Sequence, residues 1–210
     1  MGPDAEVVKA REEMMSIFEC DDVGEVNEYL GCKVERSRER IEVRSTQPVI
    51  LQSFDDEFNL PEGRVVNTPA FAGTVLNQDV EEENFSEASA HGKYRTGVGK
   101  LLHVTRSSRL EIWNTVRELT RAVKGSSRIH FVAMERVMKY CVDTPKRGWV
   151  FKPRRTWDGK SKLEFEVSDR SDSDYAKCPV TRKSVRDHNV KLEGAVVIVK
   201  SGMQNTLSQA

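Results

Sequence analysis

Apolar residues recur at helical spacing in three consecutive segments in the middle of the chain, residues 94–104, 109–123 and 128–142. In the second segment one stripe begins with Leu110, Trp113 and Val116, and the third segment has a similar stripe. Residues three and four apart lie on one face of a helix, so the pattern predicts three helices. Gly125 and Pro145 follow the second and third segments and are typical of helix ends.

The N-terminal part combines both kinds of periodicity. Residues 5–18 place apolar side chains near helical spacing, which predicts an amphipathic helix. Apolar and charged positions alternate in residues 29–35 and 40–45, which predicts two strands joined by a turn. Residues 47–58 are expected to form a short helix, because Pro48 is tolerated in a first helical turn.

Strands are also expected after the central helices. Residues 148–152, 163–167 and 195–199 are rich in residues that favour strands, and the second of these alternates strictly. Residues 60–90 have no sustained period and include three consecutive glutamates, so we expect a long loop or linker. The chain is thus helical in its middle and rich in strands toward both ends, which is an α+β pattern.

Composition narrows the class of protein. Of 210 residues, 38% are hydrophobic and 31% charged, which fits a polar globular chain of one domain or parts of two. No apolar run approaches the roughly 18–20 residues of a membrane-spanning helix, and no secretory signal pattern is present, so neither is expected. Four scattered cysteines without a Cys-x-x-Cys pair argue against a zinc ribbon or a disulfide framework. They favour a reducing intracellular location, cytoplasmic or nuclear.

The formal net charge of zero conceals two halves of opposite sign. Residues 1–90 hold 21 acidic and 8 basic side chains, whereas residues 91–210 hold 12 acidic and 25 basic ones. Basic residues are densest in residues 121–162, where Trp149 and Trp157 lie among them. Basic side chains neutralise phosphates and aromatic rings stack on bases, so this region is a candidate nucleic-acid interface. A solvated basic face over a core that contains the tryptophans is the alternative.

Three aspartates, Asp169, Asp172 and Asp174, follow the predicted strand 163–167. Carboxylates at a strand end can hold Mg²⁺, as in nucleases that clamp a phosphodiester between metal ions. The same segment is rich in serine and aspartate, which also favour a polar turn. Spacing alone leaves both interpretations open.

Four segments in order resemble one family. Residues 18–36 contain Phe-Glu-Cys-Asp-Asp-Val-Gly-Glu-Val and Tyr-Leu-Gly-Cys-Lys-Val, and residues 66–69 read Val-Asn-Thr-Pro. Residues 94–106 begin Tyr-Arg-Thr-Gly-Val-Gly-Lys-Leu-Leu-His, and residues 136–140 read Arg-Val-Met-Lys-Tyr. Residues 171–176 read Ser-Asp-Ser-Asp-Tyr-Ala, followed at 181–184 by Thr-Arg-Lys-Ser. In this order the segments resemble the Pol polyprotein of copia-type LTR retrotransposons, from the end of the reverse transcriptase to the opening of RNase H.

The resemblance implies a fold and a division of the chain. The fold is α+β, with a reverse-transcriptase palm-end hairpin and a helical thumb/connection followed by an incomplete RNase H-like β-sheet. The expected boundaries are residues 1–60 for the end of the palm, 61–90 for a linker, 91–145 for the thumb/connection and 146–210 for a truncated RNase H-like segment.

The resemblance also implies roles for particular residues. Asp172 matches the first metal-binding carboxylate of RNase H, which implies a catalytic role and Mg²⁺ as cofactor, whereas Asp174 does not match a catalytic position. The matched segments imply contacts with a template–primer duplex, either RNA–DNA or DNA. The basic residues expected to make them are Lys33, Arg36, Arg95, Lys100, Arg106, Arg136, Lys139, Arg182 and Lys183.

Departures from the family pattern limit the expected activity. The polymerase's metal-binding aspartates are absent, and the sequence stops where the next acidic motif of RNase H is expected. Cys178 replaces an acid that is common in the family, and Arg186-Asp187 replaces a pair of small residues. Without the carboxylates no metal clamp can stabilise the transition state. We therefore expect a catalytically inactive fragment with weak residual duplex binding, and self-association through unfinished sheet edges.

Two other functions stay open. One is an Mg²⁺-dependent nuclease of RNase H type whose site is completed by a partner chain. The other is a non-enzymatic module in which the acidic half of one copy docks on the basic half of another, an interaction that salt would screen. Neither requires a membrane.

Overall fold

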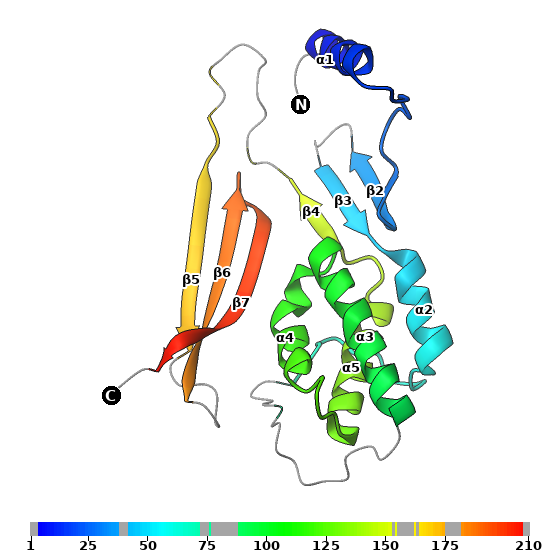
Figure 1. Ribbon diagram of the computed structural model, residues 1–210, viewed down its shortest axis with the longest axis vertical. Coiled ribbons are helices and arrows are strands. Elements are labelled where there is room, and N and C mark those ends of the chain that lie inside the picture. Colours follow the sequence, from blue (N-terminus) through cyan, green and yellow to red (C-terminus); the bar gives the residue numbers. More distant parts are fainter. Residues whose placement is uncertain are drawn as a thin grey trace.

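The computed structural model describes residues 4–37, 42–71, 76, 88–152, 154, 162, 164–174 and 182–207. These residues contain five α-helices, one 3₁₀ helix and two antiparallel β-sheets, so the chain is a mixed α and β protein. In Figure 1 one sheet lies above a group of helices and the second sheet lies beside that group. None of the helices in these ranges is long and apolar enough to cross a membrane.

The first sheet combines strands from both sides of the helical region. Its order is β1-β2-β3-β4, with bounds Glu28–Tyr29, Cys32–Ser37, Glu42–Thr46 and Trp149–Phe151. β2 and β3 form the antiparallel hairpin that the alternating pattern predicts. β4 follows the helices in sequence but pairs with β3, where Trp149 stands opposite Ser45. The strand predicted at 29–35 is confirmed in part, because a turn at residues 30–31 divides it into β1 and β2. The strands predicted at 40–45 and 148–152 are confirmed as β3 and β4 with small shifts, and residues 40–41 lie outside the described residues.

Four helices enclose the hydrophobic core. They are α2 (Pro48–Phe58), α3 (Ala88–Ser107), α4 (Trp113–Arg121) and α5 (Arg128–Asp143), and a 3₁₀ helix, η1 (Leu110–Ile112), leads into α4. The predicted apolar stripes supply this core, in which Phe54, Leu101, Val116 and Met138 are fully buried. The four predicted helices are confirmed. The loop expected at 60–90 is wrong at its end, because residues 88–90 already belong to α3, and residues 72–75 and 77–87 lie outside the described residues.

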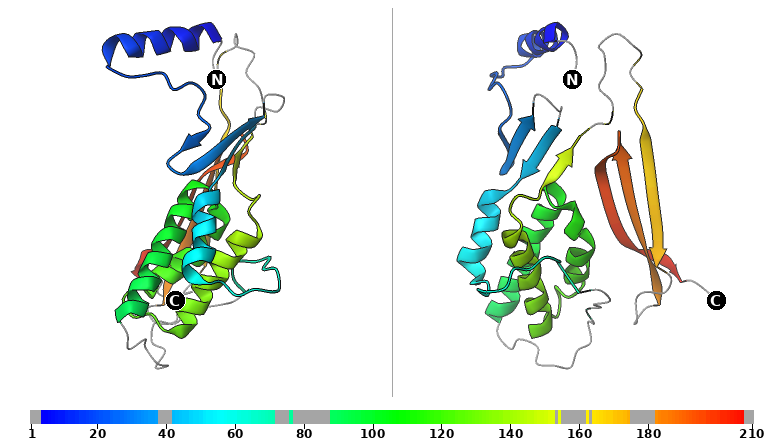
Figure 2. Two further views of the ribbon diagram at one scale, coloured as in Figure 1. Left: turned by 90° about the vertical axis from the view of Figure 1, so that its right-hand side faces the viewer. Right: turned by 180° about the vertical axis from the view of Figure 1, so that it is seen from behind.

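The N-terminal helix α1 (Asp4–Ile17) is also confirmed, but its apolar side chains are not buried. Val8, Met15 and Ile17 are exposed, and Figure 2 shows α1 projecting away from the remaining elements. The spacing of apolar residues therefore predicts the helix correctly, while the described residues provide no surface that covers it.

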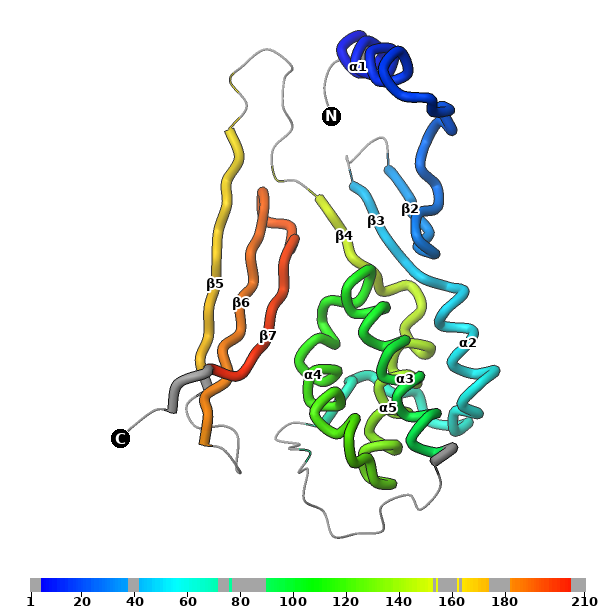
Figure 3. Tube along the Cα trace, in the orientation of Figure 1, coloured from blue at the N-terminus to red at the C-terminus, as the bar shows by residue number. Residues whose placement is uncertain are grey.

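The second sheet has the order β5-β6-β7, with bounds Val167–Asp174, Lys183–Leu192 and Ala195–Leu207 (Figure 3). The strand predicted at 163–167 is wrong in position, because residues 164–166 are irregular and β5 begins at its last residue. The Ser- and Asp-rich segment that also suited a turn is the strand itself. Pairing with β6 supplies its hydrogen bonds, and polar residues are typical of an edge strand.

A hydrogen bond joins the two sheets. The indole Nε1 of Trp149, in β4, donates to the backbone oxygen of Val196, in β7, at 2.5 Å. The second sheet also lies against the side of α4, as the views in Figures 1 and 2 show. These contacts bring the face of β5-β6-β7 next to the start of α4, and the space between them forms a cavity.

Candidate functional site

Asp172 lies on β5, which is an edge strand of the second sheet among the described residues. It stands directly opposite Asp187 of β6. Opposite residues of an antiparallel pair point to the same face, with Cβ atoms about 4.5–5.5 Å apart, so the two carboxylates are neighbours. Asp172 is exposed, and its Oδ1 accepts a hydrogen bond from the backbone N of Ser173 at 2.8 Å.

A magnesium site requires several oxygen ligands around the ion. Within the described ranges no three His, Cys, Asp or Glu side chains are grouped so that they could hold a metal ion. Asp169, predicted to accompany Asp172, lies three residues away and so on the opposite face, where its Oδ2 is 3.7 Å from Nδ1 of His188. The side chain of Asp174 lies outside the described atoms. The described residues therefore fit Mg²⁺ only in part, because Asp172 and Asp187 would supply two carboxylate ligands.

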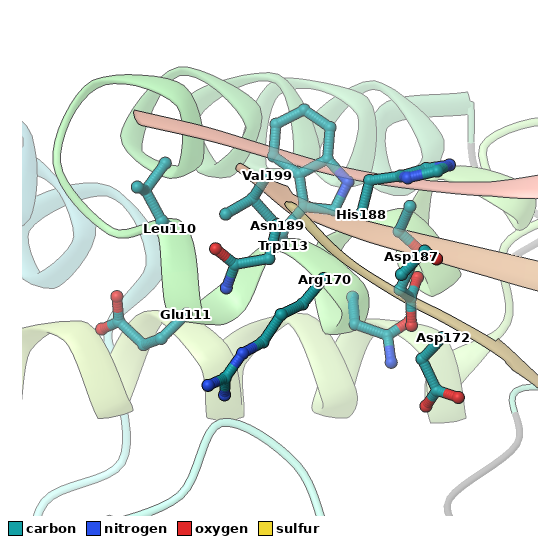
Figure 4. A pocket seen from close by; sticks show the side chains of 12 residues that line it. Leu110, Glu111, Trp113, Arg170, Asp172, Asp187, His188, Asn189 and Val199 are labelled. Carbon is teal, nitrogen blue, oxygen red and sulfur yellow. The ribbon is translucent and has the colours of Figure 1, made fainter. Parts of the chain in front are cut away.

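A cavity of about 470 Å³ lies between this face of the sheet and the helices (Figure 4). Trp113, the first residue of α4, contributes its indole ring to the wall. The sheet contributes seven polar residues to the lining, Ser171 and His188 among them. The strand register places the other five on one face of the sheet: Arg170, Asp172, Asp187, Asn189 and Ser201. The resemblance identifies only Asp172 among these residues. The local sequence pattern does not indicate that the other residues line a site, because they come together only through the pairing of the strands.

Three polar atoms in this wall have no hydrogen-bond partner among the described residues. They are Oδ1 of Asp187, Oδ1 of Asn189 and Oγ of Ser201, and each is inaccessible to solvent. An unsatisfied buried polar group costs about 1–3 kcal/mol. Such groups are rare in native proteins and call for an explanation, such as a ligand or a water molecule.

The predicted nucleic-acid-binding residues are distributed over four elements. Lys33 and Arg36 lie on β2; Arg95, Lys100 and Arg106 on α3; Arg136 and Lys139 on α5; Arg182 and Lys183 at the start of β6. Arg95 and Arg106 are exposed and share one face of α3, because eleven residues make three helical turns. The structure therefore groups the α3 pair but does not unite all nine residues on one surface.

Lys33 and Lys100 each have an acidic partner within the chain. Lys33 Nζ is 2.7 Å from Oε1 of Glu35, and this hydrogen bond, together with the lysine charge, lowers the pKa of the Glu35 carboxyl. Lys100 Nζ is 2.5 Å from Oε1 of Glu57 on α2. Both lysines would have to leave these partners to bind a phosphate.

The basic residues of α5 also serve the packing of the chain. The Arg136 guanidinium lies 3.8 Å above the centre of the Phe71 ring, and its Nη2 donates to Oγ1 of Thr68 at 3.1 Å. Lys139 forms an ion pair with Asp143, one turn further along the helix. The contacts of Arg136 hold the end of the irregular segment 61–71 against α5.

Comparison with known proteins relates the chain to a mobile genetic element. No family model matches it, and no solved structure does. Over 136 residues, 64% of its length, the chain is 21% identical to the protein named "Retrovirus-related Pol polyprotein from transposon TNT 1-94" of Nicotiana tabacum. The match covers 10% of that polyprotein. The chain is thus weakly similar to a retrotransposon Pol polyprotein.

Proposed function

We propose that the chain is a segment of a copia-type retrotransposon Pol polyprotein, from the end of the reverse transcriptase to the start of RNase H. It binds a nucleic-acid duplex weakly and is catalytically inactive on its own. The similarity to the tobacco polyprotein supports the Pol origin. The order of elements supports the region of Pol, since a hairpin, a helical unit and an antiparallel sheet follow one another as the resemblance implies.

An exposed stripe on α3 is the observation that carries duplex binding. Arg95, Gly99, His103 and Arg106 follow one another at intervals of four, four and three residues, and all are exposed. At a rise of about 1.5 Å per residue, the two arginines lie about 16 Å apart along the helix axis. A Cβ atom placed on Gly99 would meet no atom outside its own helix within 4 Å. A phosphate backbone can therefore approach the helix closely between the two arginines.

The arginines of this stripe keep donors for phosphate. Arg106 has no ion-pair partner among the described residues, and Arg95 uses its Nε for the backbone oxygen of Val123, at 3.4 Å. Guanidinium groups bind phosphate oxygens with two parallel hydrogen bonds. Lys100 lies on the same helix but is paired with Glu57, so it provides a matched comparison.

The proposed lack of catalysis follows from the chemistry at Asp172. Nucleases that use two metal ions hold both ions between several carboxylates. The described residues place one further carboxylate, that of Asp187, beside Asp172. Two carboxylates can hold one hydrated cation but do not form the clamp that stabilises both the attacking and the leaving oxygen.

Fluorescence anisotropy of a labelled RNA–DNA hybrid tests duplex binding. The variant carrying both Arg95→Ala and Arg106→Ala should bind at least about tenfold more weakly than the unmodified chain at low salt. The slope of its log affinity against log salt concentration should be smaller by the amount that about two phosphate contacts contribute. Lys100→Ala should bind within about twofold of the unmodified chain. Absence of binding at low salt, or an equal loss in Lys100→Ala, would contradict the proposal.

The position of β5 at an edge of the sheet, as far as the described residues extend, supports a second candidate, an RNase H-type nuclease completed by a partner chain. An edge strand offers unpaired backbone groups to a further strand, and such a strand would place new side chains next to Asp172. Hybrid cleavage with Mg²⁺ that Asp172→Asn abolishes would identify this activity. An intact hybrid with retained binding would support the inactive segment instead.

A further inference from the structure

The cavity beside Trp113 has no role in the duplex binding proposed for α3, and it combines three features of a ligand site. It is a hollow between two packed layers, it has an aromatic ring in its wall, and it has polar groups that lack partners. Figure 4 shows the Trp113 indole close to the strands that carry these polar groups.

The strand register explains why the polar groups gather on one face. Asp172 is opposite Asp187, and Asp187 is in turn opposite Ser201. Asn189 lies two residues from Asp187 on β6, so its side chain points to the same side of the sheet. Neighbouring strands are about 4.8 Å apart, so these oxygen atoms belong to side chains within reach of one small planar group.

The chemistry of the wall favours hydrogen-bond donors. The unpartnered atoms of Asp187 and Asn189 are acceptors, and the Ser201 hydroxyl accepts as well as donates. A ligand carrying several N–H groups would remove the cost of leaving these oxygens unsatisfied. A ligand that only accepts hydrogen bonds would not.

The charge of the wall favours a cation. Asp172 and Asp187 contribute two carboxylates, and Glu111 adds a third that is already paired with Arg109 at 2.6 Å. Among the described residues that line the cavity Arg170 is the one arginine, and it is exposed to solvent. Because adjacent carboxylates repel an anion, a phosphate-bearing ligand is disfavoured here.

We propose that this cavity binds a guanidinium group, as carried by a small guanidine compound or by an arginine side chain of another protein chain. Guanidinium is planar, always charged and rich in donors, and it stacks on aromatic faces. The Trp113 ring would cover one face of the group, while Asp187 and Asn189 would accept from its edge. Asp172 and Ser201 complete the set of acceptors at the side toward β5 and β7.

Nuclear magnetic resonance provides a direct test. The indole N–H signal of Trp113, assigned with Trp113→Phe, is followed while ethylguanidinium chloride is added at constant ionic strength. We expect the indole signal to shift until the site is saturated. The affinity for ethylguanidinium should be at least about tenfold lower in Asp187→Asn, and it should also fall in Asp172→Asn. Asp169→Asn removes a carboxylate from the opposite face of the same sheet and should leave the affinity within about twofold.

Further probes define the ligand. Ethylammonium should bind at least about fivefold more weakly than ethylguanidinium, because it lacks the planar fork. Tighter binding of N-acetyl-arginine amide than of ethylguanidinium would point to a protein arginine, and equal binding would point to a small guanidine compound. No saturable shift, an unchanged affinity in Asp187→Asn, or binding of Mg²⁺ alone without any guanidinium binding would overturn the proposal. Duplex binding through α3 is measured separately and does not depend on this result.

Discussion

The guanidinium group of Arg109 donates hydrogen bonds to both oxygens of Thr144. Its Nη1 is 3.2 Å from the backbone oxygen and its Nη2 is 2.7 Å from Oγ1. Thr144 caps the C-terminus of α5, and Arg109 directly precedes η1, so this contact joins the end of α5 to the start of η1. Nη1 also donates to the backbone oxygen of Cys141 at 3.3 Å. One buried cation thus satisfies carbonyl groups that a helix end leaves unpaired.

Replacing Arg109 with methionine should lower the free energy of unfolding by about 3 kcal/mol. Methionine keeps much of the apolar stem but leaves the acceptors on α5 without a donor, and Arg109 is only 1% exposed. Urea denaturation measures the change. Arg106→Met, at an exposed position of α3, is the control and should change stability by less than about 0.5 kcal/mol. Equal losses in both variants would show that the buried contacts of Arg109 do not stabilise the fold.

Two glycines of α3 should respond to alanine in opposite directions. Alanine stabilises an exposed helix position by about 0.5–1 kcal/mol relative to glycine, and Gly99 has free space for a Cβ atom. At Gly97 the added Cβ would lie 2.9 Å from Cε of Met138 and closer still to Sδ of Met134, both fully buried.

We therefore expect Gly99→Ala to raise the melting temperature and Gly97→Ala to lower stability by about 1–2 kcal/mol, since overpacking outweighs the gain in helix propensity. Thermal unfolding followed by circular dichroism compares the two variants under one set of conditions. Stabilisation by Gly97→Ala would mean that α3 and α5 are not packed as closely as described.

The interaction between Asp143 and its neighbours should make stability depend on pH under acidic conditions. Burial raises the pKa of the Asp143 carboxyl, but hydrogen bonds from Lys139 and from the backbone N of Val66 outweigh it and lower the pKa below 3.8. A carboxyl whose pKa is lower in the folded chain than in the unfolded chain stabilises the fold at a pH above its unfolded pKa. This stabilisation is lost as the pH falls through the folded pKa.

Asp143→Asn should therefore cost about 1–2 kcal/mol at pH 7, with a difference from the unmodified chain that shrinks below about pH 3.8. Urea titrations across this range measure it, with Asp56→Asn on the exposed side of α2 as control. A penalty that is the same at pH 7 and at pH 3 would exclude the carboxylate charge as its cause.

The cysteines should differ in their reactivity toward a thiol reagent. Burial raises the pKa of the Cys141 thiol to about 12, although the nearby Arg109 charge opposes this shift. The thiolate is the reactive form, so Cys141 should react only after unfolding, and buried Cys32 should also be slow. Exposed Cys20 should react at once, and Cys20→Ser should remove one rapidly reacting equivalent. Rapid labelling of Cys141 in the native protein would contradict its burial.

The helices could be predicted from the sequence because their apolar stripes are local signals that coincide with the buried core. Trp113 shows the limit of such a stripe, since it belongs to the predicted apolar face but is only partly buried and lines the cavity instead. The strand β5 could not be placed in the same way. Its serines and aspartates favour turns locally, and pairing with β6 decides the outcome.

The candidate site depends on register even more strongly. The resemblance identifies Asp172, but the position of Asp187 beside it follows from which residues of β5 and β6 are opposite one another. A shift of one residue would turn Asp187 to the other face of the sheet. Sequence alone therefore indicates the first carboxylate and leaves its neighbour, together with Asn189 and Ser201, undetermined.

The pairing of β3 with β4 has a consequence during protein synthesis. The ribosome releases β3 first, and β4 ends at Phe151, 105 residues after the end of β3 at Thr46. At about 5–20 residues per second, this strand edge stays uncovered for about 5–20 s on the nascent chain. During this interval the edge of β3 in the β2–β3 hairpin is open to wrong partners. A chaperone or a co-translational contact at that edge would therefore act before the helical core is complete.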